Sequence, residues 1–101
     1  MMILDKIDHI ALEVKNIKKS SDWYLKNFKC KLLYLDHSWA FIEFANTKLA
    51  LVTNGEHPPH IAILDKFLKI NDSVKRHRDG SYSKYIVDLD GNKIELIRYT
   101  L

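Results

Sequence analysis

The chain has 101 residues, 47% of them hydrophobic and 29% charged, which suits one globular domain with its own core. The net charge of +3 is mild and the basic residues are scattered, which argues against nucleic-acid binding. No apolar run approaches the roughly 20 residues of a membrane-spanning helix. With Cys30 as the only cysteine, no internal disulfide and no thiolate metal cluster can form. We expect a cytoplasmic protein without a signal peptide.

The chain opens with an alternating segment at residues 6–14, which predicts a strand. Ile10 and Leu12 fall on one face of this strand, and His9 and Ala11 fall on the other. If helices cover the aliphatic face, the histidine lies on the opposite face of the sheet.

A helix and three strands are predicted next. Residues 16–28 have helical spacing, with Asn16 as the N-cap. The buried stripe of this helix is predicted to consist of Ile17, Trp23, Tyr24 and Phe28. The three strands cover residues 31–35, 39–44 and 48–52, and short polar turns separate them.

The second half predicts the same order of elements with a shorter helix. Its predicted elements are a strand at 60–63, a helix at 65–70 with Phe67 and Leu68 inward, and strands at 74–78, 83–87 and 93–99. The sequence "DLDGN", residues 88–92, is a strong signal for a hairpin turn, because Asp-Gly and Gly-Asn favour the positive φ that tight turns need.

Two pairs of similar segments indicate an internal repeat. "HIAL" at 9–12 recurs as "HIAI" at 60–63, and "TKLALV" at 47–52 recurs as "NKIELI" at 92–97. The order is the same in both halves. We therefore predict one domain, 1–101, made of module one (1–54), a linker (55–59) that contains two prolines, and module two (60–101).

Three polar residues stand on the strand faces opposite the aliphatic ones. They are His9, His60 and Glu95. Two such modules side by side would gather them on one concave face. Two imidazoles and one carboxylate form a facial triad that suits a divalent metal with open coordination positions. Each residue alone is commoner as a hydrogen-bonded or half-exposed strand residue, but both repeats open with a histidine.

The sequence "IDHIALEVKNIKKSSDWYLKNF", together with "HIAI" and "YIVDLDGNKIELI", resembles the vicinal oxygen chelate superfamily over nearly the whole chain. That superfamily contains glyoxalase I, bleomycin-resistance proteins, fosfomycin-resistance transferases, methylmalonyl-CoA epimerase and extradiol dioxygenases. The resemblance implies an α+β fold of two paired βαβββ modules, which form a cupped mixed sheet with helices on the outer face. The usual "DPDGN" turn carries leucine in place of proline here.

The resemblance also implies a divalent metal ion (Fe, Mn, Ni or Zn) held by His9, His60 and Glu95, with Tyr85 as a catalytic residue. Glyoxalase-like members have a fourth ligand where this chain has Ala50, so a three-ligand site is expected. A small oxygen-rich substrate and a homodimer are also implied. The reaction would be of the lyase, isomerase, transferase or dioxygenase type.

Other possibilities remain open at this stage. The chain could be a metal-free ligand-binding module like the bleomycin-resistance proteins, or a structural dimer in which the histidines only form hydrogen bonds. Glu43 is a candidate for a substitute base if it points into the cup, although exposure is the simpler prediction. The remaining polar and aromatic candidates are expected in turns, on the surface or in packing contacts; these are His37, His57, His77, Trp23 and Trp39.

Overall fold

The computed structural model describes residues 2–55, 57–71, 73–77 and 79–99. The elements of this part of the chain are β1 (Ile7–Glu13), α1 (Ile17–Asn27), β2 (Lys31–Leu35), β3 (Trp39–Glu43), β4 (Lys48–Val52), β5 (His60–Leu64), β6 (Lys75–Arg76), β7 (Tyr82–Val87) and β8 (Lys93–Arg98). Glu56 of the predicted linker and Arg78 of the predicted strand 74–78 lie outside the described residues. The described part contains no helix that is long and apolar enough to cross a membrane.

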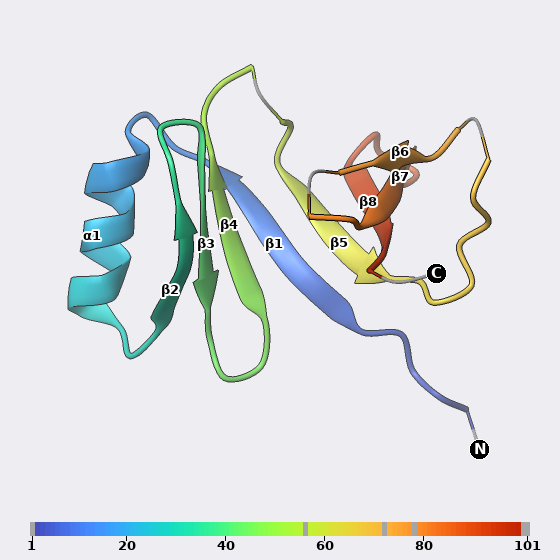
Figure 1. Cartoon of the computed structure of the whole chain (residues 1–101), viewed down its shortest axis with the longest axis horizontal. Coiled ribbons are helices and arrows are strands. Elements are labelled where there is room, and N and C mark those ends of the chain that lie inside the picture. Colours follow the sequence, from blue (N-terminus) through green and yellow to red (C-terminus); the bar gives the residue numbers. More distant parts are fainter. Residues whose placement is uncertain (1, 56, 72, 78, 100–101) are drawn as a thin grey trace.

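The eight strands form one mixed sheet in the order β2-β3-β4-β1-β5-β8-β7-β6 (Figure 1). Each half pairs its opening strand parallel with its closing strand, β1 with β4 and β5 with β8. The two opening strands pair antiparallel with each other at the centre. The sheet is strongly twisted, and in Figure 1 the strands β6–β8 run in different directions from β1–β4. The predicted α+β fold of paired βαβββ-like modules is confirmed.

Helix α1 covers the first half of the sheet on what we call the outer face, which carries Ile10 and Ile61. The predicted N-cap is confirmed, because the side-chain oxygen of Asn16 accepts a hydrogen bond of 2.9 Å from the backbone N–H of Lys19. Buried Ile17 packs with three sheet residues in the main core cluster. Those sheet residues are Ala40, Ile42 and Leu51.

Two residues of the predicted helix stripe point away from the core. Trp23 is 54% exposed and Phe28 is 49% exposed, so the prediction that they are buried was wrong. The inward line is Ile17, Ser21 and Tyr24, spaced i, i+4, i+7. Trp23 lies beside that line and packs its ring against Tyr24 and Phe28 instead.

The predicted helix at 65–70 was also wrong, because this segment is a turn followed by irregular chain. Phe67 is 89% exposed, whereas Leu68 is 4% exposed and is buried as predicted. The Asp65 side chain accepts a hydrogen bond from the backbone N–H of Phe67, and the carbonyl of Leu68 accepts one from Arg98. Six residues form too few helical hydrogen bonds to offset the cost of starting a helix, so these tertiary contacts decide the conformation.

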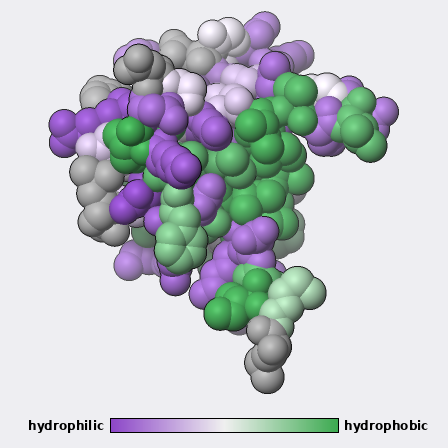
Figure 2. Space-filling model, turned by 90° about the vertical axis from the view of Figure 1, so that its right-hand side faces the viewer, coloured by the Kyte–Doolittle hydropathy of each residue, from purple (hydrophilic) through white to green (hydrophobic). Residues whose placement is uncertain are grey.

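The described part of module two has no helix to cover its outer face. The strand registers align Ile10, Ile61, Ile94 and Ile86 in one row across β1, β5, β8 and β7. Three of these isoleucines are 37–44% exposed. Viewed from the side of β6–β8, the molecule presents one continuous hydrophobic area (Figure 2).

Candidate metal centre

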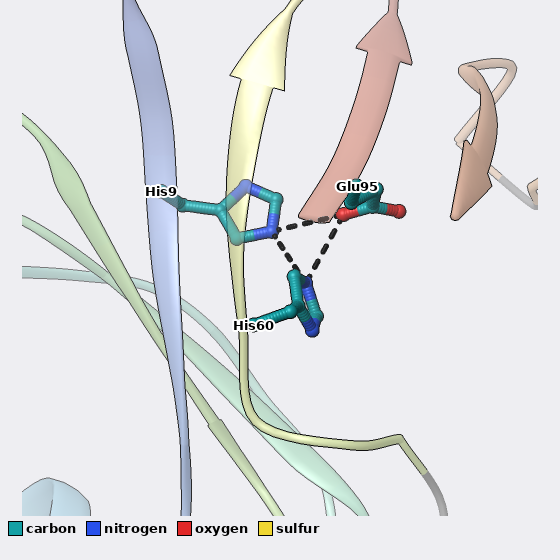
Figure 3. A group of neighbouring side chains, drawn as sticks. All are labelled: His9, His60 and Glu95. Carbon is teal, nitrogen blue, oxygen red and sulfur yellow. Dashed lines mark hydrogen bonds and ion pairs between the residues drawn. The ribbon is translucent and has the colours of Figure 1, made fainter. Parts of the chain in front are cut away.

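Three side chains from three strands meet on the inner face of the sheet, opposite α1. His9 extends from β1, His60 from the first residue of β5 and Glu95 from β8, and all three point toward one another (Figure 3). The Nε2 atoms of the two histidines are 3.3 Å apart. Glu95 Oε1 lies 3.3 Å from His9 Nε2 and 3.1 Å from His60 Nε2. Each residue is less than 10% exposed.

The repeated "HIA" segments explain this convergence. Because β1 and β5 run antiparallel, His9 lies opposite Ala62, and His60 lies opposite Ala11. Each histidine therefore faces the alanine of the other repeat. Glu95 is also a neighbour of Ala62, from the β8 side. Both alanines are almost fully buried, and their short side chains leave the space above the sheet to the histidines and the carboxylate.

The Nδ1 atom of His9, which points away from the cluster, lies beside the partly buried carboxylate of Asp8. His9 Nδ1 lies 2.8 Å from Asp8 Oδ2, which also accepts a hydrogen bond of 2.5 Å from the Tyr99 hydroxyl. Lys48 Nζ lies 3.1 Å from the other oxygen of Asp8. Asp8 can reach the ring of the adjacent residue because the register with β5 shifts between Ile7 and His9, as at a β-bulge.

The Nδ1 atom of His60 also has a hydrogen-bond acceptor. His60 Nδ1 lies 2.8 Å from the carbonyl oxygen of Pro58. A carboxylate and a carbonyl can only accept hydrogen bonds, so the Nδ1 atoms of His9 and His60 both carry hydrogen. This assigns lone pairs to both inward Nε2 atoms when the imidazoles are neutral. Metal-binding histidines typically have this second hydrogen bond.

The spacing of the three donor atoms fits one metal ion. The described chain contains a single group of three such residues whose donor atoms all lie within 4.8 Å of one another, and it is this one. Ligands at about 2.1 Å from a common ion are about 3.0 Å apart at right angles and about 3.4 Å apart at tetrahedral angles. The observed separations of 3.1–3.3 Å lie between these values. The donor set and its geometry are therefore compatible with a facial triad.

The closeness of these side chains shifts the pKa values of His9 and Glu95. Burial alone would lower the pKa of His9, but its hydrogen bonds to Asp8 and Glu95 outweigh burial and raise this pKa above the usual value. Burial would likewise raise the pKa of Glu95, yet the hydrogen bonds from the two histidines hold it well below its usual range. Without metal, and at a pH below the raised pKa of His9, a proton on His9 thus shares the centre with an ionised Glu95.

Tyr85 lies at the edge of the cluster. It is the cross-strand neighbour of Glu95, and its hydroxyl lies 3.4 Å from His60 Nδ1. Burial and the negative charge of Glu95 both raise the pKa of Tyr85, so its hydroxyl keeps its proton at neutral pH. Tyr85 is 39% exposed, which leaves it accessible to a ligand from solvent.

The fourth position of the glyoxalase-like pattern is occupied by a side chain without a donor. Ala50 is buried beside Ala11 and opposite Phe41, whose ring packs edge-on against His9. Glu43, the possible substitute base, is exposed at the end of β3 and has Lys48 as its cross-strand neighbour.

His77 lies at a turn, as expected, but its side chain also reaches the cluster, which was not expected. His77 Nε2 lies 3.7 Å from Glu95 Oε2 and 2.6 Å from the hydroxyl oxygen of Ser83. Sequence reasoning missed both residues. Ser83 is two residues from Tyr85 in the same strand, so the two side chains lie on the same face of the sheet. This spacing was the one feature of the sequence that could have indicated a role for Ser83. His37 and His57 are exposed.

Trp39 is half-buried and stacks on Tyr34 with ring centroids 4.6 Å apart. Its other aromatic neighbour is Phe41. Two surface hollows lie elsewhere, and neither includes a member of the cluster. One is lined by residues 29–31 and 43–45, and the other by residues 15–18, 35–37 and 53. The candidate chemistry therefore belongs to the buried cluster.

Neither a protein-family model nor a curated protein sequence matches the chain. Solved structures do. BH1468, a hypothetical protein from Bacillus halodurans C-125, has 23% identity and a TM-score of 0.76, with 95% of each chain covered. Methylmalonyl-CoA epimerase from Mycobacterium tuberculosis has 14% identity and a TM-score of 0.77, covering 97% of this chain and 92% of the epimerase.

A third structure is methylmalonyl-CoA epimerase from Streptomyces coelicolor in complex with 2-nitronate-propionyl-CoA. It has 15% identity and a TM-score of 0.74, covering 95% of this chain and 98% of the epimerase. Likeness at these identities establishes the fold. The chain shares the fold of these epimerases, with two βαβββ-like modules in one mixed sheet, as the resemblance seen in the sequence predicted.

The stability of the metal-free protein should depend on the His9–Glu95 pair. The pKa of His9 is raised above 6.5, so its stabilisation is full below about pH 6.5 and is lost as pH rises through the folded-state pKa. The pKa of Glu95 is lowered below 4.5, so its contribution is present above that pH and is lost as pH falls through the folded-state value. Urea unfolding with a chelator, over a series of pH values, measures this.

The control is His9→Gln, which cannot take up the proton. The free energy of unfolding of the parent minus that of the variant should be largest between about pH 4.5 and 6.5 and should decline above that range. A difference that stays constant from about pH 5 to about pH 9 would contradict the assigned pair.

Proposed function

We propose that this protein is a divalent-metal-dependent enzyme that binds a small oxygen-rich substrate at His9, His60 and Glu95. The observation that carries the proposal is the mutual spacing of the three donor atoms, 3.1–3.3 Å, in a buried position. Two imidazole nitrogens and one carboxylate oxygen suit Fe(II), Mn(II), Ni(II) or Zn(II). When bound, such an ion supplies Lewis acidity for a developing oxyanion or enolate, or open positions for oxygen chemistry.

The residues around the ligands have distinct tasks in this proposal. Asp8 and the Pro58 carbonyl fix the tautomer and the direction of the two imidazoles. Glu95 stays ionised because of its lowered pKa. Tyr85 keeps its proton, so it serves as a hydrogen-bond donor or general acid toward a substrate oxygen rather than as a base. Ala50 has no carboxylate, so a glyoxalase I mechanism that uses a base there is disfavoured.

The proposed reaction is of the lyase, isomerase, transferase or dioxygenase type. The epimerase structure with 2-nitronate-propionyl-CoA adds acyl-CoA thioesters to the substrate classes worth testing. A screen should include acyl-CoA thioesters, α-ketoaldehyde–thiol adducts, catechols and fosfomycin, each with and without added metal.

A second candidate function is metal-free ligand binding, like that of the bleomycin-resistance proteins. The His9–Glu95 pair favours it, because a proton on His9 satisfies the buried carboxylate without any ion. The metal content and metal affinity of the purified protein should be measured first, because these quantities separate the two functions.

Removal of His9 should abolish tight metal binding. We expect the parent to bind at least one of Fe(II), Mn(II), Ni(II) and Zn(II) with one ion per site, and His9→Ala to bind that ion about 100-fold or more weakly. Isothermal titration calorimetry measures both. The matched control is His37→Ala, an exposed histidine, which should bind like the parent. Equal affinity in His9→Ala and the parent would sink the metal-site proposal.

Tyr85→Phe separates binding from chemistry. Loss of the hydroxyl should lower turnover of the substrate found in the screen by about 100-fold, in the range typical of general acid–base groups. Metal affinity should stay close to that of the parent, because the hydroxyl lies by the outer nitrogen of His60 rather than among the three donor atoms. Unchanged turnover would remove Tyr85 from the catalytic assignment.

The proposal also includes a homodimer, formed through the uncovered outer face of β1, β5, β8 and β7. Its support is the row of Ile10, Ile61, Ile94 and Ile86, which a second identical sheet face could cover in a symmetric contact. Sedimentation velocity should give a dimer for the parent and a monomer for Ile61→Lys. Leu33→Lys, at an exposed leucine of β2, should remain dimeric. A monomeric parent would contradict the proposal.

A further inference from the structure

The two oxygens of Glu95 have different surroundings. Oε1 faces the Nε2 atoms of His9 and His60 at 3.1–3.3 Å. Oε2 faces away from them, toward His77 Nε2 at 3.7 Å. A carboxylate can bind a metal through one oxygen or through both. The neighbours of Oε2 therefore decide how many coordination positions Glu95 occupies.

His77 and Ser83 form a short relay beside Oε2. His77 Nε2 lies 2.6 Å from Ser83 Oγ, and Ser83 is 1% exposed. A proton on Nε2 is favoured there, because a lone pair would face the negative carboxylate. His77 then donates to Ser83 Oγ, and the single hydroxyl proton of Ser83 is left to donate elsewhere. The Ser83 hydroxyl is among the hydrogen-bonding groups that lower the pKa of Glu95, which agrees with donation to the carboxylate.

The backbone fixes His77 in this position. Its N–H donates to the carbonyl of Ser81 at 2.8 Å, and the N–H of Gly80 donates back to the His77 carbonyl at 3.0 Å. Gly80 has a φ of +87°, which favours glycine in the turn. The turn after the two-residue edge strand β6 thus brings the His77 imidazole to the rim of the buried cluster.

We propose that Ser83 and His77 are positioning residues that retain Glu95 Oε2 on the protein side, so that Glu95 binds metal through Oε1 alone. The inference rests on the proposed metal site. One oxygen from Glu95 and one nitrogen from each histidine would then hold the ion, and its remaining positions would be open to water and to substrate oxygens. A bidentate Glu95 would remove one of these.

Co(II) is a suitable probe, because its visible absorption changes with coordination number. Ser83→Ala and His77→Leu should each weaken Co(II) binding by about 10- to 100-fold and should change the Co(II) spectrum. Ser83→Thr and His77→Gln retain a hydroxyl and an N–H donor, and both should restore the parent spectrum. The matched control is Ser21→Ala, which removes a buried hydroxyl that donates to the Ile17 carbonyl within α1. Thermal unfolding of each metal-free variant checks that it is folded.

The possible outcomes are distinct. Parent-like affinity and spectrum in folded Ser83→Ala and His77→Leu would overturn the positioning role and leave the proposed function intact. A loss in His77→Leu as large as in His9→Ala, with Ser83→Ala unchanged, would make His77 a direct ligand and also overturn it. Failure of the parent to bind Co(II) or any tested ion is the failure of the proposed function, and the inference would fall with it.

Discussion

The structure depends on one constraint, which is that three proton-accepting atoms share a buried space only slightly wider than a hydrogen bond. With both Nδ1 atoms donating outward, His9 Nε2, His60 Nε2 and Glu95 Oε1 turn lone pairs toward one another. A carboxylate in a site less than 10% exposed loses much of its hydration, and this cost must be offset by a nearby positive charge. A proton on His9 provides one such charge and a divalent cation provides a larger one, so proton and metal compete for the same three atoms.

The internal repeat is the means by which the fold assembles this constraint. Antiparallel pairing of β1 and β5 sets each histidine against the alanine of the other repeat, so one short sequence pattern, used twice, produces both histidines of the cluster and the space between them. The parallel pairing of opening and closing strands then adds the third group. Glu95 lies beside Ala62, and its counterpart in the first half, Ala50, lies beside Ala11. Residues almost 90 positions apart in the chain meet because the sheet order sets β1 and β8 on either side of β5.

Much of this could be predicted from the sequence, because period-two alternation determines which face of a strand each residue occupies. His9, His60 and Glu95 share a face for that reason. What the sequence did not reveal depends on local departures from regular pairing. Strict alternation sets Asp8 on the face opposite His9, and only the bulge brings its carboxylate to the imidazole. His77 approaches the cluster through a turn whose conformation requires a left-handed glycine. The segment at 65–70 has helical composition, but the hydrogen bond from Arg98 to Leu68 and the shortness of the segment favour a turn.

The substitution of alanine at position 50 has an electrostatic consequence for any ion bound at this site. Two neutral imidazoles and one carboxylate leave a divalent cation with a single uncompensated positive charge, whereas a second carboxylate at position 50 would have neutralised it. Asp8 does not change this balance, because its own charge is matched by Lys48 at 3.1 Å. In a buried site of low effective dielectric, an uncompensated charge attracts an anionic partner strongly. If the proposed ion is bound, it would favour a substrate that binds through an ionised oxygen. The Tyr85 hydroxyl, which keeps its proton, would then be able to donate a hydrogen bond to that oxygen.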